Sequence, residues 1–564
     1  MVKPKIKIAL ISFAICAFSF SNLQAFDMAS RHSGKADVYV EMASIRQSIT
    51  DLRTFSDNLF GPQAQAVIDS LTEESKELGF NPLDIKSLEK AGFNVDHSVG
   101  ISAFMENKAT GKTSAVVIIP ASSPDTLYKV LMAGISRGIT KDKEQAERAG
   151  QDYTGSQLKE LKKGKTFVIQ NDEMPAYFVK GSDCIVIADT LASAEDATGK
   201  VSNSIANAEY YLDLRKEFIT RNKGKIPFLS VFVRPDKISE LSASSSAMAG
   251  SVETINQSVL IAEMEKNLRG GGGFVNFSKY ELKAQLTYLY KDGYLTDKNS
   301  MIGRLVNSDK TRLTAEYLKK TPIFFFGLRM NFPATIALLS EISTDFAKSI
   351  AEANAELSQE TSLNLEEDIL KAFTGSFVLA LPVIPPEEQL KKVSAWDGFF
   401  SAGIDPGRRN NLEKLMNYIE QDAKKDPSAP KISKKTAGKT TLWTMTFAEG
   451  LSGSVGGKIE PESIYLLLSE DEAMLGFSSK RLELLRNLPR SGQTFQSQIL
   501  KTDDEKIVSL IHVDLASIVA YIKGSSLKMM AMGYLPYLEK LSSLSLSSDI
   551  SGNFATNDLI LKLK

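Results

Sequence analysis

Cysteine and histidine are scarce in this chain of 564 residues, which contains two of the first and three of the second. Cys16 lies in an apolar N-terminal run, so a chain that has lost this run keeps only Cys184. One thiol cannot form an internal disulfide, and burial of apolar side chains must therefore hold the fold together. The apolar neighbours of Cys184 predict a buried strand residue rather than a reactive thiol.

The same scarcity bears on metal sites. No two histidines stand at the spacing of ligands on one helix, and a single thiol cannot build a thiolate site. The acidic clusters at 366–368 and 470–472 lack the alternating oxygen ligands and the glycine of a calcium loop. We therefore expect no metal ion, and no motif in the sequence predicts a cofactor.

A marked excess of charge is also missing, because the formal net charge is −1. A surface that binds nucleic acid needs a cluster of basic side chains, so we expect no nucleic-acid partner. Beyond the N-terminus, no apolar run approaches the roughly 20 residues that a membrane-spanning helix needs. We expect no transmembrane span once the leader is removed.

The N-terminus predicts an export leader. Three lysines, Lys3, Lys5 and Lys7, precede an apolar run at 8–20, and the small residue Ala25 follows at a suitable distance for cleavage. We assign 1–25 as a signal peptide and expect the mature protein in the periplasm or outside the cell. The alternative is a leader that is kept as an anchor.

A repeated pattern organises the rest of the chain. The segment 228–241 and the segment 507–519 each contain a run of apolar and β-branched residues, then an aspartate, then a helical pattern. Five further pairs of segments match in the same order: 36–42 with 322–330, 83–104 with 363–383, 114–131 with 398–416, 166–189 with 441–479, and 280–290 with 557–564. Matches in a constant order predict an internal duplication.

We predict an α+β fold: two tandem copies of a mostly antiparallel sheet with helices packed on one face. The predicted boundaries are 1–25 for the leader, 26–300 for the first repeat domain, 301–320 for a helical connector and 321–564 for the second repeat domain. The glycine run at 270–273 predicts a flexible joint, and the lysine- and proline-rich stretch 426–440 an exposed loop.

Two aspartates are the best candidates for acid–base chemistry, because both repeats contain one. Asp236 and Asp514 each follow a strand pattern and precede a helical pattern. The alternative is that each aspartate caps the helix that follows. The histidines are less suggestive: we expect His32 in a disordered start of the mature chain and His512 as a structural residue in an apolar strand.

A methionine-rich stretch is the most unusual candidate surface. We predict a helix over 526–541 that is apolar nearly all round, and methionine side chains adapt to irregular partners. A groove for a lipid or an apolar peptide is one interpretation, and core packing is the other. The candidate residues for an apolar ligand or partner are Met529, Met530, Met532, Leu535, Tyr537 and Leu538.

The order of these elements, the leader and the strand–aspartate–helix corners at Asp236 and Asp514 resemble a family of exported bacterial proteins known by a domain of unknown function. The resemblance covers most of the mature chain. It implies an exported bacterial protein, and it implies neither an activity nor site residues.

The sequence favours an exported, non-enzymatic binding or scaffold protein that acts through its two repeats. Its partner would be another envelope protein or an apolar ligand. Two alternatives stay open: a carboxylate-dependent hydrolase of the cell envelope, and a carrier of an apolar ligand. Nearby carboxylates with perturbed pKa values would favour the hydrolase, and a long apolar groove would favour the carrier.

Overall fold

The structure is a computed structural model. It describes residues 28–66, 69, 78–105, 113–153, 155–170, 175–238, 263, 266–306, 322–382, 384–385, 387–389, 395, 397–447, 462–487 and 507–564. The leader at 1–25 and most of the connector at 301–320 lie outside these residues. The chain divides into two compact units, of which the first comprises 1–243 and 268–289 and the second 244–267 and 290–562.

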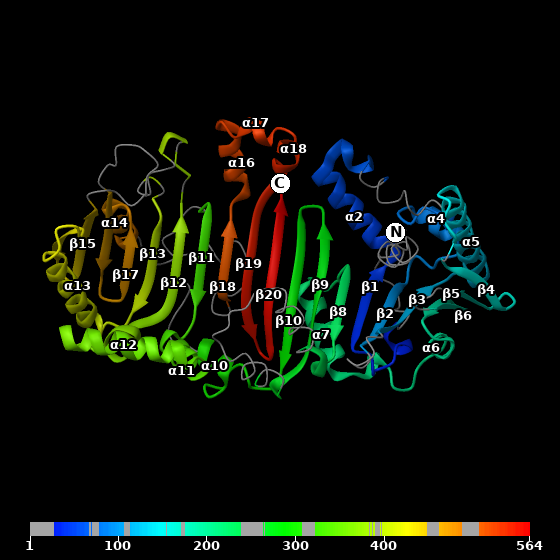
Figure 1. Cartoon of the computed structure of the whole chain (residues 1–564), viewed down its shortest axis with the longest axis horizontal. Helices are drawn as coiled ribbons and strands as arrows, with labels where there is room; N and C mark the ends of the chain where they lie inside the picture. Colours follow the sequence, from blue (N-terminus) through cyan, green and yellow to red (C-terminus); the bar gives the residue numbers. More distant parts are fainter. Residues whose placement is uncertain are drawn as a thin grey trace. The chain divides into compact units, whose positions relative to one another are not determined.

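The first unit is built on one sheet (Figure 1). Its strand order is β10-β9-β8-β1-β2-β3-β7-β6-β5-β4, and the pairs from β9 to β4 are antiparallel. The strands are β1 (Val38–Ser44), β2 (Ser98–Met105), β3 (Thr113–Pro120), β4 (Gln157–Lys162), β5 (Thr166–Gln170), β6 (Ala176–Lys180), β7 (Cys184–Ala188), β8 (Leu229–Val233), β9 (Leu268–Ser278) and β10 (Glu281–Tyr290).

The second unit has the order β20-β19-β18-β11-β12-β13-β17-β16-β15-β14. The order of these strands along the chain and across the sheet is the same as in the first unit. The strands are β11 (Phe324–Arg329), β12 (Phe373–Leu381), β13 (Phe399–Ile404), β14 (Lys431–Ala437), β15 (Thr440–Phe447), β16 (Glu462–Leu468), β17 (Glu472–Gly476), β18 (Ile507–Val513), β19 (Leu541–Ser551) and β20 (Phe554–Leu563). Mixed helices and antiparallel strands make this an α+β protein.

Helices connect the strands in both units. In the first unit they are η1 (Met28–Arg31), α2 (Ile45–Phe60), η2 (Gly61–Gln63), α4 (Ile85–Lys90), α5 (Pro124–Arg148), α6 (Leu191–Asp196), η4 (Ile205–Asn207) and α7 (Glu209–Arg221). In the second they are α10 (Met301–Val306), α11 (Phe332–Ile342), α12 (Thr344–Thr361), η5 (Leu365–Ile369), η6 (Leu370–Ala372), η7 (Glu387–Gln389), α13 (Arg409–Ala423), α14 (Ser479–Asn487), α16 (Leu515–Gly524), α17 (Lys528–Ala531) and α18 (Leu535–Leu538).

Helices cover both faces of the first sheet, so the expectation of helices on one face is wrong. Val116 and Ile118 of β3 pack in a cluster with α6, whereas Ile119 of the same strand packs in a cluster with α5. The reason is visible in β7, whose residues are apolar without alternation, a pattern typical of strands buried on both faces.

The second sheet is covered in the same way. Met474 of β17 packs with Leu482 of α14, and the adjacent Ala473 packs on the opposite face in the cluster that includes Leu412 of α13. Trp443 of β15 is fully buried in the α13 cluster and is the largest side chain of the core.

Two stretches that the sequence predicted as loops are strands. The glycine run at 270–273 lies inside β9, where a Cβ atom on Gly272 would come within 2.2 Å of the Val231 carbonyl oxygen. These glycines therefore let the backbones of neighbouring strands approach closely, and they do not form a flexible joint. Part of the stretch 426–440 forms β14, whose side chains are mostly exposed and include three lysines.

Candidate functional site

The methionine-rich stretch lies beyond the ends of the strands in the second unit, after β18 and α16 (Figure 1). Asp514 caps α16, the helix that leads to this stretch: its carboxylate accepts hydrogen bonds from the Ser517 amide at 3.1 Å and the Ser517 hydroxyl at 2.6 Å. The chain then turns through α17 and α18 and returns as β19. We call residues 527–534 the methionine tip.

Five large apolar side chains of the methionine tip are exposed to solvent. Met529 and Met530 on α17 expose 76% and 84% of their surface, and Met532 exposes 57%. Leu527 and Tyr534 flank them and are also exposed. Soluble proteins seldom present this many large apolar side chains together, and such a cluster marks a surface that contacts something else.

The other three predicted residues of this stretch do not belong to the tip surface. Leu535 is buried, while Tyr537 and Leu538 are half-buried. The predicted single helix over 526–541 is also wrong, because two short helices separated by 532–534 replace it. Gly533 is a poor helix former, and Pro536 lacks an amide hydrogen but suits the first turn of a new helix, which is where it lies in α18.

Contacts at its base fix the tip to the second unit. The Ser526 amide donates to Glu387 Oε2 at 3.0 Å, and the Ser526 hydroxyl also hydrogen-bonds to the Glu387 carboxylate. Lys523 pairs with Glu539 at 2.9 Å across the base, and this lysine holds the pKa of the Glu539 carboxyl below its usual value. From Ser525 to Leu538 the chain contains one charged residue, Lys528.

A second apolar surface crosses the sheet of the same unit. Seven residues that lie directly opposite one another on neighbouring strands form one row, which we call the sheet row: Leu546, Ile511, Phe326, Leu379, Phe400, Leu475 and Leu466. Leu379, Phe400 and Leu546 of this row are exposed, and the rest are partly buried. Partners in register share a face, so the row is a continuous apolar band.

The candidate carboxylates have structural partners. The Arg234 guanidinium donates hydrogen bonds to both carboxylate oxygens of Asp236, at 2.6 and 2.8 Å. These bonds hold the pKa of the Asp236 carboxyl below its usual range. Asp514 is the N-cap described above. The capping alternative therefore describes Asp514, whereas Asp236 lies in the first turn of a helix and forms an ion pair.

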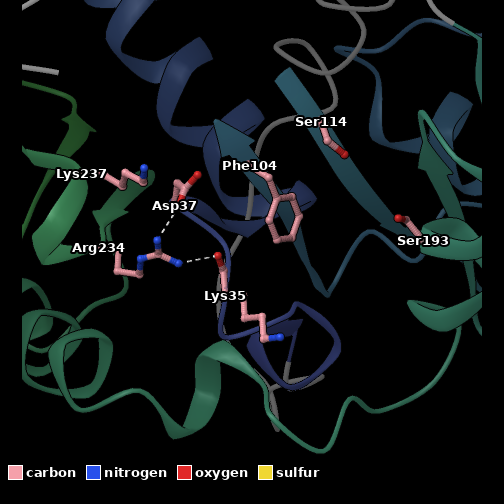
Figure 2. A pocket seen from close by; sticks show the side chains of 7 residues that line it. All are labelled: Lys35, Asp37, Phe104, Ser114, Ser193, Arg234 and Lys237. Atoms are coloured by element: carbon pink, nitrogen blue, oxygen red, sulfur yellow. Dashed lines mark hydrogen bonds and ion pairs between the residues drawn. The ribbon is translucent and has the colours of Figure 1, made fainter. Parts of the chain in front are cut away.

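A pocket of about 380 Å³ lies beside Arg234 in the first unit. Figure 2 shows Arg234 reaching the Asp37 carboxylate, at 3.0 Å, and the Lys35 carbonyl oxygen, at 2.7 Å. The pocket serine Ser114 donates its hydroxyl to Asp189 at 2.8 Å. The arginine and this serine are thus engaged by protein groups, which favours a structural role for them. The full lining is Lys35, Asp37, Phe104, Ser114, Ser193, Arg234 and Lys237.

Two histidines are buried in the two units. His32 is not in a disordered segment: it is fully buried, and its Nδ1 lies 2.8 Å from the Ser102 hydroxyl. His512 is buried in β18 with its Nδ1 at 2.9 Å from the Ser545 hydroxyl. Burial lowers the pKa of His32 to about 3 and that of His512 to about 4, so both rings are neutral at pH 7.

Cys184 is buried in β7, as the sequence predicted, and burial raises the pKa of its thiol to about 11. Within the residues that the structure describes, no cluster of three or more histidine, cysteine, aspartate or glutamate side chains could hold a metal ion. No helix in the same described ranges combines the length and apolar character needed to cross a bilayer.

Sequence reasoning missed residues of both surfaces. Leu527 and Tyr534 adjoin the predicted methionines, and their place in the same short apolar stretch was the available signal. Leu379 and Phe400 lie in strands whose largely apolar sequences are typical of buried strands. Only the pairing of β12 with β13 reveals that they share an exposed face.

Comparisons with known proteins assign neither a family nor a function to this chain. No family model matches the chain, and no curated protein matches it. Among solved structures, crystal form IV of TP0453 matches with 8% identity and a TM-score of 0.22, over 49% of this chain and 87% of that chain. Crystal form I of TP0453 matches with 9% identity and a TM-score of 0.21, over 47% and 80%. A likeness at this level indicates nothing specific about this chain.

Proposed function

We propose that this chain is an exported, non-enzymatic binding protein that engages an apolar partner through the methionine tip of its second unit. The observation that carries the proposal is the exposure of Met529 and Met530 on a helix that the base contacts hold in place. Side chains that stay exposed in the isolated chain contribute little to its folding, so their burial against a partner can stabilise a complex.

The remaining contacts support binding over hydrolysis. A hydrolase of the kind we considered needs carboxylates close together with pKa values set for proton transfer. Asp236 and Asp514 are instead held by Arg234 and Ser517, respectively. A ligand carrier is the second candidate, and the exposed Leu379, Phe400 and Leu546 of the sheet row favour it because an apolar ligand could cover them.

We further propose that the two units arose by duplication of one α+β unit, with the binding surface specialised in the second copy. The equal strand orders support this origin. So do the matched segment pairs in the sequence. The first repeat has no sequence equivalent of the methionine tip, because no stretch with this density of methionines occurs in 26–300.

A photoreactive amino acid in place of Met530 tests the binding function. In cells that express the full chain, we expect illumination to produce a defined adduct from position 530. The matched control carries the same residue in place of Leu212, which is an isolated exposed leucine on α7. Equal labelling from both positions, or no adduct from position 530, would contradict the proposal.

A further inference from the structure

We infer that the partner of the methionine tip is the interface of a lipid bilayer that contains anionic lipids. This inference rests on the binding function proposed above and names its partner. Five exposed apolar side chains lie on α17 or close to it, between Gly524 and α18: Leu527, Met529, Met530, Met532 and Tyr534. An exposed apolar surface beyond the strand ends fits the boundary between headgroups and acyl chains.

The geometry of α17 disfavours a groove in another protein. Helices that bind in grooves present anchors over two turns or more, at positions i, i+3, i+4 and i+7. Helix α17 has four residues, and Met529 and Met530 are adjacent on it, so they point in different directions around the helix. A fluid interface can accept side chains in both directions, whereas one groove cannot.

The charges around the tip suit an anionic surface. Lys528 lies among the exposed methionines, and its aliphatic stem can follow them while the ammonium group stays at the headgroups. No acidic residue occurs between Ser525 and Leu538. At the base, Glu539 is paired with Lys523, and Glu387 accepts hydrogen bonds from Ser526. The part of the chain that would enter the interface is therefore apolar or positive, and anionic lipids attract it.

Tyrosine adds the amphipathic element found at membrane interfaces. Tyr534 is 70% exposed and directly precedes α18, so its ring can lie among the lipids while its hydroxyl remains hydrated. The Ser526–Glu387 hydrogen bonds and the buried Leu535 keep the tip in one conformation before contact. A preformed tip loses less conformational entropy on binding than a disordered loop would.

Co-flotation of the mature chain, 26–564, with vesicles tests the inference. We expect the chain to float with vesicles of phosphatidylglycerol and phosphatidylethanolamine and to partition less onto phosphatidylcholine alone. The double variant Met529→Gln with Met530→Gln should lose at least about tenfold in partitioning, because two large apolar side chains no longer enter the lipid. Lys528→Glu should lose at least about fivefold on the anionic vesicles only.

The control variant Leu212→Gln changes an exposed apolar side chain on α7, outside the methionine tip, and should float like the unchanged chain. All three variants alter exposed residues, so thermal unfolding should show that they remain folded. No flotation, or flotation that the methionine variant leaves unchanged, would overturn the lipid inference. If position 530 forms its cellular adduct with a protein rather than with lipid, the lipid inference also fails while the proposed binding function stands.

Discussion

Phe399→Ala is expected to lower the free energy of unfolding of the second unit by about 3–5 kcal/mol, the usual cost of removing a buried phenylalanine. The adjacent Phe400→Ala is expected to cost about 1 kcal/mol or less. The two side chains leave the same strand on opposite faces: Phe399 is 2% exposed and packs in the core, whereas Phe400 is 38% exposed in the sheet row. The pair therefore compares the two faces of one strand with the same substitution.

Denaturant unfolding monitored by tryptophan fluorescence measures this difference, because Trp443 lies in β15 of the second unit. The buried Trp443 should report loss of the core directly. Equal costs for the two substitutions would mean that Phe400 is buried in solution. The sheet row would then be part of the core and not a surface available to a ligand.

Acidification from pH 7 to pH 5 is expected to destabilise both units, because each contains a buried neutral histidine. The pKa values of His32 and His512 are about 3 and about 4 in the folded chain, against 6.5 for an exposed histidine. Below pH 6.5 the unfolded chain binds protons that the folded chain does not, so stability is full above pH 6.5 and falls toward the folded pKa. Below pH 6.5 each histidine should lower the free energy of unfolding by about 1.4 kcal/mol per pH unit, which amounts to about 2 kcal/mol at pH 5.

Unfolding measured at pH 7, 6 and 5 tests this expectation. His512→Gln can keep a hydrogen bond to Ser545 without titrating, and His32→Gln can do the same with Ser102. Each substitution should reduce the pH dependence of the free energy of unfolding of its own unit. A dependence that persists unchanged in the double variant would show that other groups cause the acid sensitivity.

The strands of the core could be predicted from the sequence, and the polar strands β4 and β14 could not. Apolar runs identify strands such as β7 and β13 because burial requires them. By contrast, β4 and β14 are polar and charged along most of their length, as edge strands often are. Only the pairing of each with its neighbour makes it a strand, and a periodicity of apolar residues cannot reveal that pairing.

The candidate site could be predicted only in part for a similar reason. The density of methionines singled out Met529, Met530 and Met532, and the structure exposes all three. Which residues of the stretch are exposed depends on where the first helix ends and the second begins. Gly533 and Pro536 set this interruption of the helix. Leu535, assigned to the same surface from the sequence, turns inward after it. Tertiary placement decides burial here, and local pattern alone does not.

Methionine oxidation by dilute hydrogen peroxide, followed by mass spectrometry, tests the central claim most directly. In the isolated chain, Met529, Met530 and Met532 should oxidise quickly, while the buried Met42 and Met474 should resist and serve as internal references. In intact envelopes the account predicts that the three tip methionines become protected. Oxidation of these methionines at the same rate in envelopes as in the isolated chain would contradict a binding role for the tip.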